Sequence, residues 1–225
     1  LGAAMLLVGA AVSQAAEPPA APKAPPVATS SGALNYGEYG RPTTLDPITN
    51  NDMIAMRITE LVFNGLVGID NKQQIVPELA ESWDMASDGQ VYTFRLRKDV
   101  RWHARPGEEP RPFTADDVVF TYKIMMHPKT ITPLKVRYEF IDEVKKLDSH
   151  SVRFTLKRPI MNALPKFTFK IIPEFGPTNS AYLARDDAFV QKPIGTGPYQ
   201  YKETTANGEI VLEANPHYFK GAPKI

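Results

Sequence analysis

The sequence predicts a mixed α/β (α+β) lobe, and three observations lead to this fold class. Residues 92–96 and 152–156 each alternate apolar and polar side chains with the period of two that is typical of half-buried strands. Between them, a capped apolar-periodic segment that begins at Thr114 indicates a helix. The chain has 225 residues, of which 43% are hydrophobic, which is enough for one large or two small domains with a real core. Strands and helices that alternate along one chain indicate a mixed lobe.

The N-terminal segment predicts export. Residues 1–12 form a short apolar run, and Ser13-Gln14-Ala15 supplies small residues where a signal peptidase cleaves, so we expect a partial signal peptide over residues 1–16. The run lacks an initiator Met and a basic flank, so the sequence is expected to begin inside this leader; a buried N-terminal helix is the alternative. Residues 17–33 are rich in Pro and Ala and predict a disordered linker.

The folded part is expected to open with a short strand at residues 33–38. A helix follows over about residues 52–63, with Gly65 as its stop. Three residues are expected on its apolar face: Ile54, Ile58 and Leu61. A further strand is predicted at residues 66–69.

Two turns with glycine locate further strands. Asp88-Gly89 precedes the strand at residues 92–96, and Asn207-Gly208 precedes a strand at residues 210–213. The strand at residues 152–156 completes the set, and no internal repeat appears.

The helix that begins at Thr114 carries two terminal signals. Asp117 lies three residues on and completes a capping box, while Phe113 is placed to pack against Val118 as a hydrophobic staple. The core-facing side is predicted to hold Val118, Tyr122 and Met125 or Met126.

Charge and composition argue against several functions. With 26 basic and 25 acidic residues the formal charge is +1, so neither nucleic acid nor an anionic membrane is predicted as a partner. There is no cysteine, so no disulfide, thiolate metal site or lipidated-cysteine anchor is expected. His103, His127, His150 and His217 are scattered, which argues against a zinc site, and no cofactor or catalytic constellation is predicted.

Four separated blocks carry a resemblance to a known family. They are Thr44-Leu45-Asp46-Pro47, the stretch 77–122, the run 192–199 (KPIGTGPY) and the run 215–221 (NPHYFKG). In this order they resemble the dipeptide, oligopeptide and nickel class of extracellular solute-binding proteins, which deliver ligands to ABC importers. The likeness covers residues 34–225.

The resemblance implies a periplasmic-binding-protein-like lobe. Residues 34–49 and 168–225 would form the sheet subdomain of the first lobe, and residues 50–167 an inserted subdomain. Members of this family have a second lobe, which would lie beyond Ile225 and is missing here. The chain would then keep one wall of the ligand cleft and bind weakly by itself.

The resemblance also implies where ligand would bind. In the family the segment after the Leu-Asp-Pro element lines the cleft, which here is Asn50, Asn51, Asp52 and Met53. Amides and an adaptable thioether suit a pocket that accepts varied side chains. The alternative is that Asn51 or Asp52 caps the helix and Met53 belongs to the core.

A second group of contacts falls further along the chain. Leu134 lies where relatives often carry an aromatic residue that contacts the ligand. A leucine cannot stack as an aromatic ring does, so a stacking role at this position is not expected. Lys166 and Lys170 lie where some relatives place a basic ligand contact, although solvated lysines are the alternative.

Other residues are interpreted as structural. Trp83 and Trp102 are predicted to be core aromatics rather than cleft residues. The Gly195-Thr196-Gly197-Pro198 run is interpreted as a tight strand entry, because it lacks the Lys-Ser/Thr of a phosphate loop. Residues 103–112 are longer than in relatives and are interpreted as a charged surface loop, with a docking element for the permease as the alternative.

The function implied by the resemblance is that of a monomeric periplasmic receptor. It would bind di- or oligopeptides between two lobes and deliver them to an ABC transporter permease in the inner membrane. A nickel chelate, an opine or a sugar is the alternative ligand. A secreted hydrolase is the alternative from another class.

Overall fold

The computed structural model describes residues 32–105, 107–177 and 187–224. Two units are distinguished, Leu1–Asn35 and Tyr36–Ile225. The predicted signal peptide and nearly all of the predicted linker lie outside the described residues. None of the helices in the described ranges is long and apolar enough to cross a membrane.

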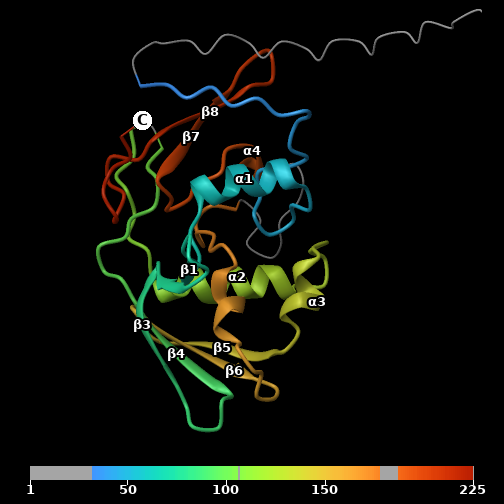
Figure 1. The fold of residues 1–225 in the computed structure, drawn as a ribbon, viewed down its shortest axis with the longest axis vertical. Coiled ribbons are helices and arrows are strands. Elements are labelled where there is room, and N and C mark those ends of the chain that lie inside the picture. Colours follow the sequence, from blue (N-terminus) through green and yellow to red (C-terminus); the bar gives the residue numbers. More distant parts are fainter. Residues whose placement is uncertain (1–31, 106, 178–186, 225) are drawn as a thin grey trace, which may run out of the picture. The chain divides into compact units, whose positions relative to one another are not determined.

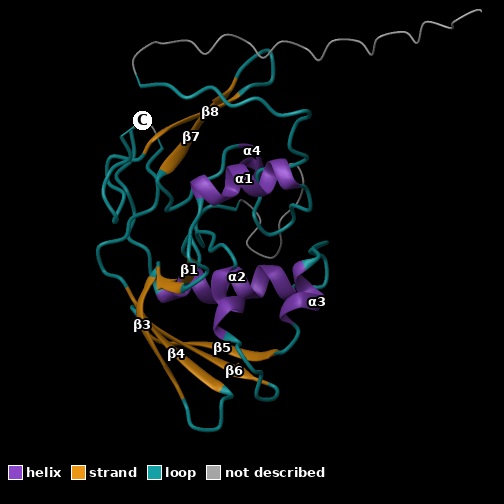
Figure 2. Cartoon of the chain, in the orientation of Figure 1, coloured by secondary structure: helices purple, strands orange, loops and turns teal. Residues whose placement is uncertain are grey.

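The second unit combines helices with three antiparallel sheets, which confirms the mixed α/β class (Figures 1 and 2). The helices are α1 (Met53–Val62), α2 (Ala115–Met126), α3 (Leu134–Tyr138), α4 (Ala188–Gln191) and the 3-10 helix η1 (Leu164–Thr168). The strands are β1 (Val67–Ile69), β2 (Ile75–Pro77), β3 (Ala80–Met85), β4 (Val91–Leu96), β5 (Ile141–Asp148), β6 (Ser151–Leu156), β7 (Tyr199–Thr204) and β8 (Ile210–Ala214). The sheet orders are β1-β2, β3-β4-β6-β5 and β7-β8.

The predicted alternating strands form the centre of the four-stranded sheet. β4 and β6 pair with Phe94 opposite Val152, and the alternate residues of both strands are buried. Helix α2 packs against β5 and β6, so this sheet has one covered face. The opposite face carries Arg95 and Arg153, which are exposed, as is common for antiparallel sheets.

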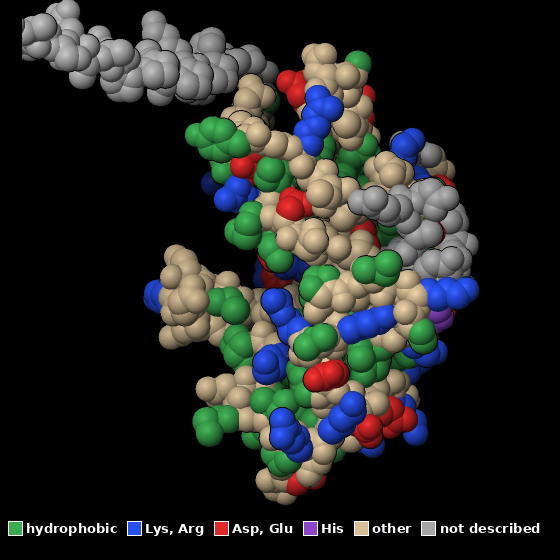
Figure 3. Space-filling view, turned by 90° about the vertical axis from the view of Figure 1, so that its right-hand side faces the viewer, with side chains coloured by type: hydrophobic (Ala, Val, Ile, Leu, Met, Phe, Trp, Pro, Cys, Tyr) green, Lys and Arg blue, Asp and Glu red, His purple; other side chains and the backbone are tan. Residues whose placement is uncertain are grey.

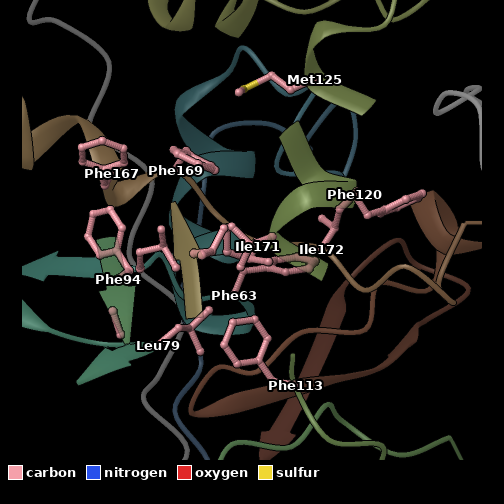
Figure 4. Packing of buried hydrophobic residues seen from close by; sticks show 14 of the residues in the cluster. Phe63, Leu79, Phe94, Phe113, Phe120, Met125, Phe167, Phe169, Ile171 and Ile172 are labelled. Carbon is pink, nitrogen blue, oxygen red and sulfur yellow. The ribbon is translucent and has the colours of Figure 1, made fainter. Parts of the chain in front are cut away.

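Aromatic rings fill the space behind this sheet. The Phe94 ring lies 4.8 Å from that of Phe167 and 5.6 Å from that of Phe154, centroid to centroid, and Figure 4 shows Phe94 and Phe167 facing one another. Trp102 is buried against Phe113, as predicted for a core aromatic. Trp83 is only half-buried, because it lies at the edge of the same cluster.

Helix α2 begins as predicted. The Thr114 side chain and the Asp117 carboxylate form a reciprocal capping box, with the Thr114 N–H donating to Asp117 Oδ2 at 2.9 Å. Phe113 and Val118 are both buried in the main core. The strands expected at residues 66–69 and 210–213 are also confirmed, as β1 and β8.

Two local predictions are wrong. Residues 33–38 form no strand, since no described segment pairs with them and Leu34 and Tyr36 are exposed. The helix predicted over about residues 52–63 is confirmed as α1, but Gly65 does not end it: Phe63 is the C-cap, and the φ of Gly65 is not positive. A Cβ at Gly65 would lie 2.8 Å from the Thr168 carbonyl oxygen, so close backbone approach explains this glycine.

The predicted apolar face of α1 is correct only in part, since Ile58 is half-buried against the core. The buried residues are Ala55, Thr59 and Val62, whereas Leu61 is exposed. The chain entering β7 approaches the backbone of Leu61 and Val62 closely, at the C-terminal end of α1. Packing by distant residues, rather than the hydrophobicity of each position, decides which face is covered.

Candidate functional site

The turn that leads into α1 is closed by a buried carboxylate. Asp46 Oδ1 accepts a hydrogen bond from the Ile48 N–H at 2.9 Å, and Oδ2 accepts one from the Thr49 N–H at 3.1 Å. The Asn50 N–H donates to the Asp46 carbonyl at 3.1 Å. Burial raises the pKa of Asp46 to about 6, although the hydrogen bonds from Thr49 and Ile48 oppose that rise. The turn is therefore tightly bonded before the helix begins.

Asp52 is the N-cap of α1, as one of the two interpretations predicted. Its Oδ1 accepts from the Ala55 N–H at 2.7 Å, and its Oδ2 accepts from the Thr43 N–H at 3.0 Å and from the Thr43 hydroxyl at 2.6 Å. Burial disfavours the charged form, but these hydrogen bonds outweigh it and hold the pKa of Asp52 below its ordinary value.

The residues beside the cap differ in accessibility. Asn50 is buried, and its Nδ2 donates to the Thr59 hydroxyl at 3.3 Å. Asn51 is exposed and its side chain makes no hydrogen bond with a described residue. Met53 is 63% exposed, so its assignment to the core is wrong. Asn51 and Met53 are thus the members of this segment with free surface.

Leu134 lies close to this turn through its neighbour Thr132. The Thr132 hydroxyl donates to the Ile48 carbonyl and accepts from the Leu134 N–H at 3.0 Å. The segments around residues 48 and 132, which are 84 positions apart, therefore lie side by side. Leu134 itself is half-buried at the start of α3.

Lys170 lies beside the other half of α1. Its Nζ donates to Glu60 Oε2 at 2.6 Å, and its side chain is 14% exposed. Seven residues separate Met53 from Glu60, which corresponds to about 10 Å along the helix axis. Lys166 instead lies over the Phe140 ring, 5.5 Å from its centroid. The structure thus places Asn51, Met53 and Lys170 along one helix.

The C-terminal end of α1 is fixed by three residues that the sequence did not group: His103, Gly195 and Gly197. The Gly197 N–H donates to the Val62 carbonyl at 2.8 Å, and a Cβ at Gly195 would lie 1.8 Å from the Val62 carbonyl oxygen. His103 exchanges backbone and ring hydrogen bonds with this run: its N–H donates to the Gly195 carbonyl at 2.8 Å. The glycines are required because helix and loop meet backbone to backbone.

The tautomer of His103 follows from its partners. The Gly195 N–H donates to Nδ1 at 3.2 Å, so Nε2 carries the proton and donates to the Gly197 carbonyl at 3.0 Å. Burial lowers the pKa of His103 to about 4, so the ring is neutral near pH 7. A single histidine beside a charged loop offered no sequence signal for this role. The rest of the 103–112 loop is exposed where described, apart from Pro110, which is half-buried.

A polar network joins the same helix end to two further blocks. Asn64 Oδ1 accepts from the Thr196 hydroxyl at 3.1 Å, and its Nδ2 donates to Glu78 Oε1 at 3.3 Å and to the Tyr218 hydroxyl at 3.5 Å. Lys220 Nζ lies 3.6 Å from Glu78 Oε1. These contacts position the chain rather than form a reactive centre.

Within the described ranges, no group of three or more His, Cys, Asp or Glu residues could hold a metal ion. The surface is also mixed in charge. Figure 3 looks onto the side on which α3 lies in Figure 1, and Lys and Arg side chains alternate there with apolar and acidic ones. Because the two signs of charge are mixed, this surface has no strong electrostatic field of one sign that would attract charged solutes.

Comparison with known proteins identifies relatives of the chain. Residues 74–225 match the profile of the family described as bacterial extracellular solute-binding proteins, family 5 Middle. The chain is 36% identical over 170 residues to Di/tripeptide-binding protein 2 of Pseudomonas aeruginosa (strain UCBPP-PA14), covering 67% of this chain and 31% of that protein.

Solved structures agree with this. The structure of the oligopeptide-binding protein AppA from Bacillus subtilis, in complex with a nonapeptide, superposes with a TM-score of 0.71 at 30% identity, covering 83% of this chain and 37% of AppA. NikZ from Campylobacter jejuni, in complex with Ni(L-His), gives a TM-score of 0.69 at 30% identity, covering 81% and 35%. The chain thus spans about a third of the length of the relatives it matches.

Proposed function

Because the chain belongs to the family 5 bacterial extracellular solute-binding proteins, we propose that it forms part of the solute receptor of an ABC importer and that its solute is a short peptide. The similarity to a di/tripeptide-binding protein at 36% identity carries this proposal. The ligand is held and released without bond breaking, since solute receptors work by differential binding in open and closed states.

Two accessible side chains at the start of α1 suit a peptide. Asn51 offers a carbonyl acceptor and an NH₂ donor, which match the N–H and C=O of a peptide bond. Met53 presents a flexible thioether that packs against side chains of different shape. Asp52 lies between them and fixes the backbone there, because its carboxylate caps the helix and also accepts from the Thr43 N–H.

Lys170 supplies the positive charge at the other half of the helix. Its ammonium group is held by Glu60, whose own side chain is 67% exposed and can rotate into water. A peptide carboxylate that approached Lys170 would then take the place of Glu60, and the Lys170 ammonium group would keep a negatively charged partner. Asn50, by contrast, shapes the turn from inside, and Leu134 borders it from the neighbouring segment.

The remaining parts of the proposal concern location and partners. The leader-like segment at residues 1–16 and the extracellular family support export to the periplasm. We propose that the protein acts there as a monomer that meets the permease of the inner membrane, and that residues 34–49 and 168–225 form one subdomain with residues 50–167 inserted.

The proposal is tested by NMR titration of the ¹⁵N-labelled chain with trialanine, because chemical shifts report binding even at a millimolar dissociation constant. We expect saturable shifts at the amides of Asn51 and Met53. Asn51→Ala should reduce the shifts, whereas Asn71→Ala, at an exposed asparagine elsewhere on the surface whose φ is not positive, should not.

The titration is repeated with Ni(L-His), with mannopinic acid and with acetate at equal concentration. Saturation by either of the first two but not by trialanine would replace the peptide with that ligand class. Hydrolysis of trialanine by the protein, followed by the appearance of free alanine, would contradict a receptor without catalysis.

A further inference from the structure

A pocket lies away from the surface proposed for the peptide, beside the turn that joins β3 and β4; Figure 1 shows the course of this hairpin. Its volume is about 480 Å³, within the range of small-molecule sites. The lining residues are Trp83, Met85, Gly89, Tyr92, Pro159, Ile160, Met161, Asn162, Ala163 and Leu164. The lining contains no charged side chain.

The pocket is built on a rigid aromatic floor with adaptable edges. The Tyr92 ring packs 5.3 Å from that of Phe167, which belongs to the aromatic core behind the sheet. Met161 is 90% exposed and Met85 is 59% exposed, and both can fold over a bound molecule because thioether side chains are flexible. A fixed base and movable apolar edges are features of a ligand site.

One polar group in the lining lacks a partner. Tyr92 is only 4% exposed, and its hydroxyl makes no hydrogen bond with any described residue. By contrast the hydroxyl of Tyr122, on the covered side of the same subdomain, donates to the Ile141 carbonyl at 2.9 Å. Among the described residues only the Thr130 hydroxyl is fully buried without a partner, so the Tyr92 oxygen reaches solvent at the pocket and is available to a ligand.

We propose that this pocket binds a small, uncharged, mainly apolar molecule that carries one hydrogen-bond acceptor for the Tyr92 hydroxyl. A free peptide is excluded, since its ammonium and carboxylate would lose water without meeting an opposite charge. The pocket therefore selects a different chemical class from the surface along α1. Asn162, which adopts the left-handed conformation with φ 54°, turns the chain at the pocket edge.

The test uses 6-propionyl-2-(dimethylamino)naphthalene, a neutral fluorescent molecule with an apolar body and one carbonyl acceptor. Titrated into the full chain, it should show saturable binding with a blue-shifted emission and energy transfer from tryptophan. Tyr92→Phe should weaken binding about tenfold, as expected for one buried hydrogen bond. Met161→Lys should weaken it as well by placing a charge at the edge.

Matched controls separate the pocket from general effects. Tyr122→Phe removes a hydroxyl outside the pocket and Val136→Lys adds a charge to an exposed apolar position on α3, so both should bind the dye like the parent. Tyr92→Phe should also melt like the parent without ligand, since its hydroxyl has no partner to lose. The absence of saturable binding, equal affinity of the parent and both pocket variants, or displacement of the dye by dialanine would overturn the proposal.

Discussion

Substitution of Gly195 by alanine should destabilise the fold more than its small size suggests. The added Cβ would lie 1.8 Å from the Val62 carbonyl oxygen and 2.7 Å from its carbonyl carbon. These are backbone atoms of α1 and cannot rotate away, so loop and helix would have to separate by more than about 1.5 Å to reach ordinary contact.

The expected cost has two parts. Forced separation in a packed interior costs about 1–3 kcal/mol. The Gly197 N–H to Val62 carbonyl bond, now 2.8 Å, would be lost with it, at about 1 kcal/mol. The free energy of unfolding should therefore fall by about 2–4 kcal/mol, a large part of the 5–15 kcal/mol typical of whole domains.

Urea unfolding followed by circular dichroism measures this difference. Gly37→Ala is the matched control, because a Cβ there meets nothing within 4 Å and the φ of Gly37 is not positive. If Gly195→Ala unfolded within 0.5 kcal/mol of Gly37→Ala, on the scale of an ordinary surface change, the close approach between this loop and α1 would be refuted.

Three further outcomes follow from the same contacts. The pKa of His103 lies at about 4 in the folded state and 6.5 in the unfolded state. The stability that the neutral ring contributes is therefore present above pH 6.5 and lost as the pH falls toward 4. In His103→Gln the free energy of unfolding should fall by about 2–3 kcal/mol less between pH 7 and 4.5 than in the parent. Asp117→Ala leaves the buried Trp102 Nε1–H without an acceptor and the N–H groups of Thr114 and Glu174 without theirs, and should lower the urea midpoint by the equivalent of about 3 kcal/mol. Glu60→Gln removes the negative charge beside Lys170 and should change the free energy of unfolding by less than about 1 kcal/mol. It should strengthen trialanine binding in the NMR titration, because the carboxylate of the peptide no longer competes with Glu60. Weaker binding would contradict a role of Lys170 in holding that carboxylate.

Local signals predicted the elements whose formation depends on adjacent residues. The alternation in β4 and β6 and the capping box of α2 lie within a few positions of one another, and both are confirmed. The strand expected at residues 33–38 depended on a partner that no described residue supplies. The close contacts at the C-terminal end of α1 depend on glycines more than 130 positions away, which a helical period cannot reveal.

The site was predictable to a smaller extent. Capping by Asp52 has a sequence signature and is confirmed, and Met53 is not in the core. Other features depend on which residues, distant in the sequence, lie nearby in the fold. They are the ion pair of Lys170 with Glu60, the hydrogen bonds of neutral His103 to the 195–197 run, and the Tyr92 hydroxyl without a protein partner. No local pattern encodes such encounters, and contact of Asn51 or Leu134 with a peptide stays a prediction.

Three of the four sequence blocks that resemble the family converge on the ends of one helix. The Thr44–Pro47 block closes the turn before α1, the 192–199 block packs on its last carbonyls, and the 215–221 block reaches it through Asn215, whose Nδ2 donates to the Gly197 carbonyl at 3.0 Å. These contacts therefore hold both ends of α1 in place. We therefore expect ligand choice to depend on accessible residues outside these three blocks, such as Asn51 and Met53. Exchanging Met53 for a bulkier or charged residue should alter which peptides bind while leaving the fold intact, and unchanged preference across a tripeptide panel would contradict this division.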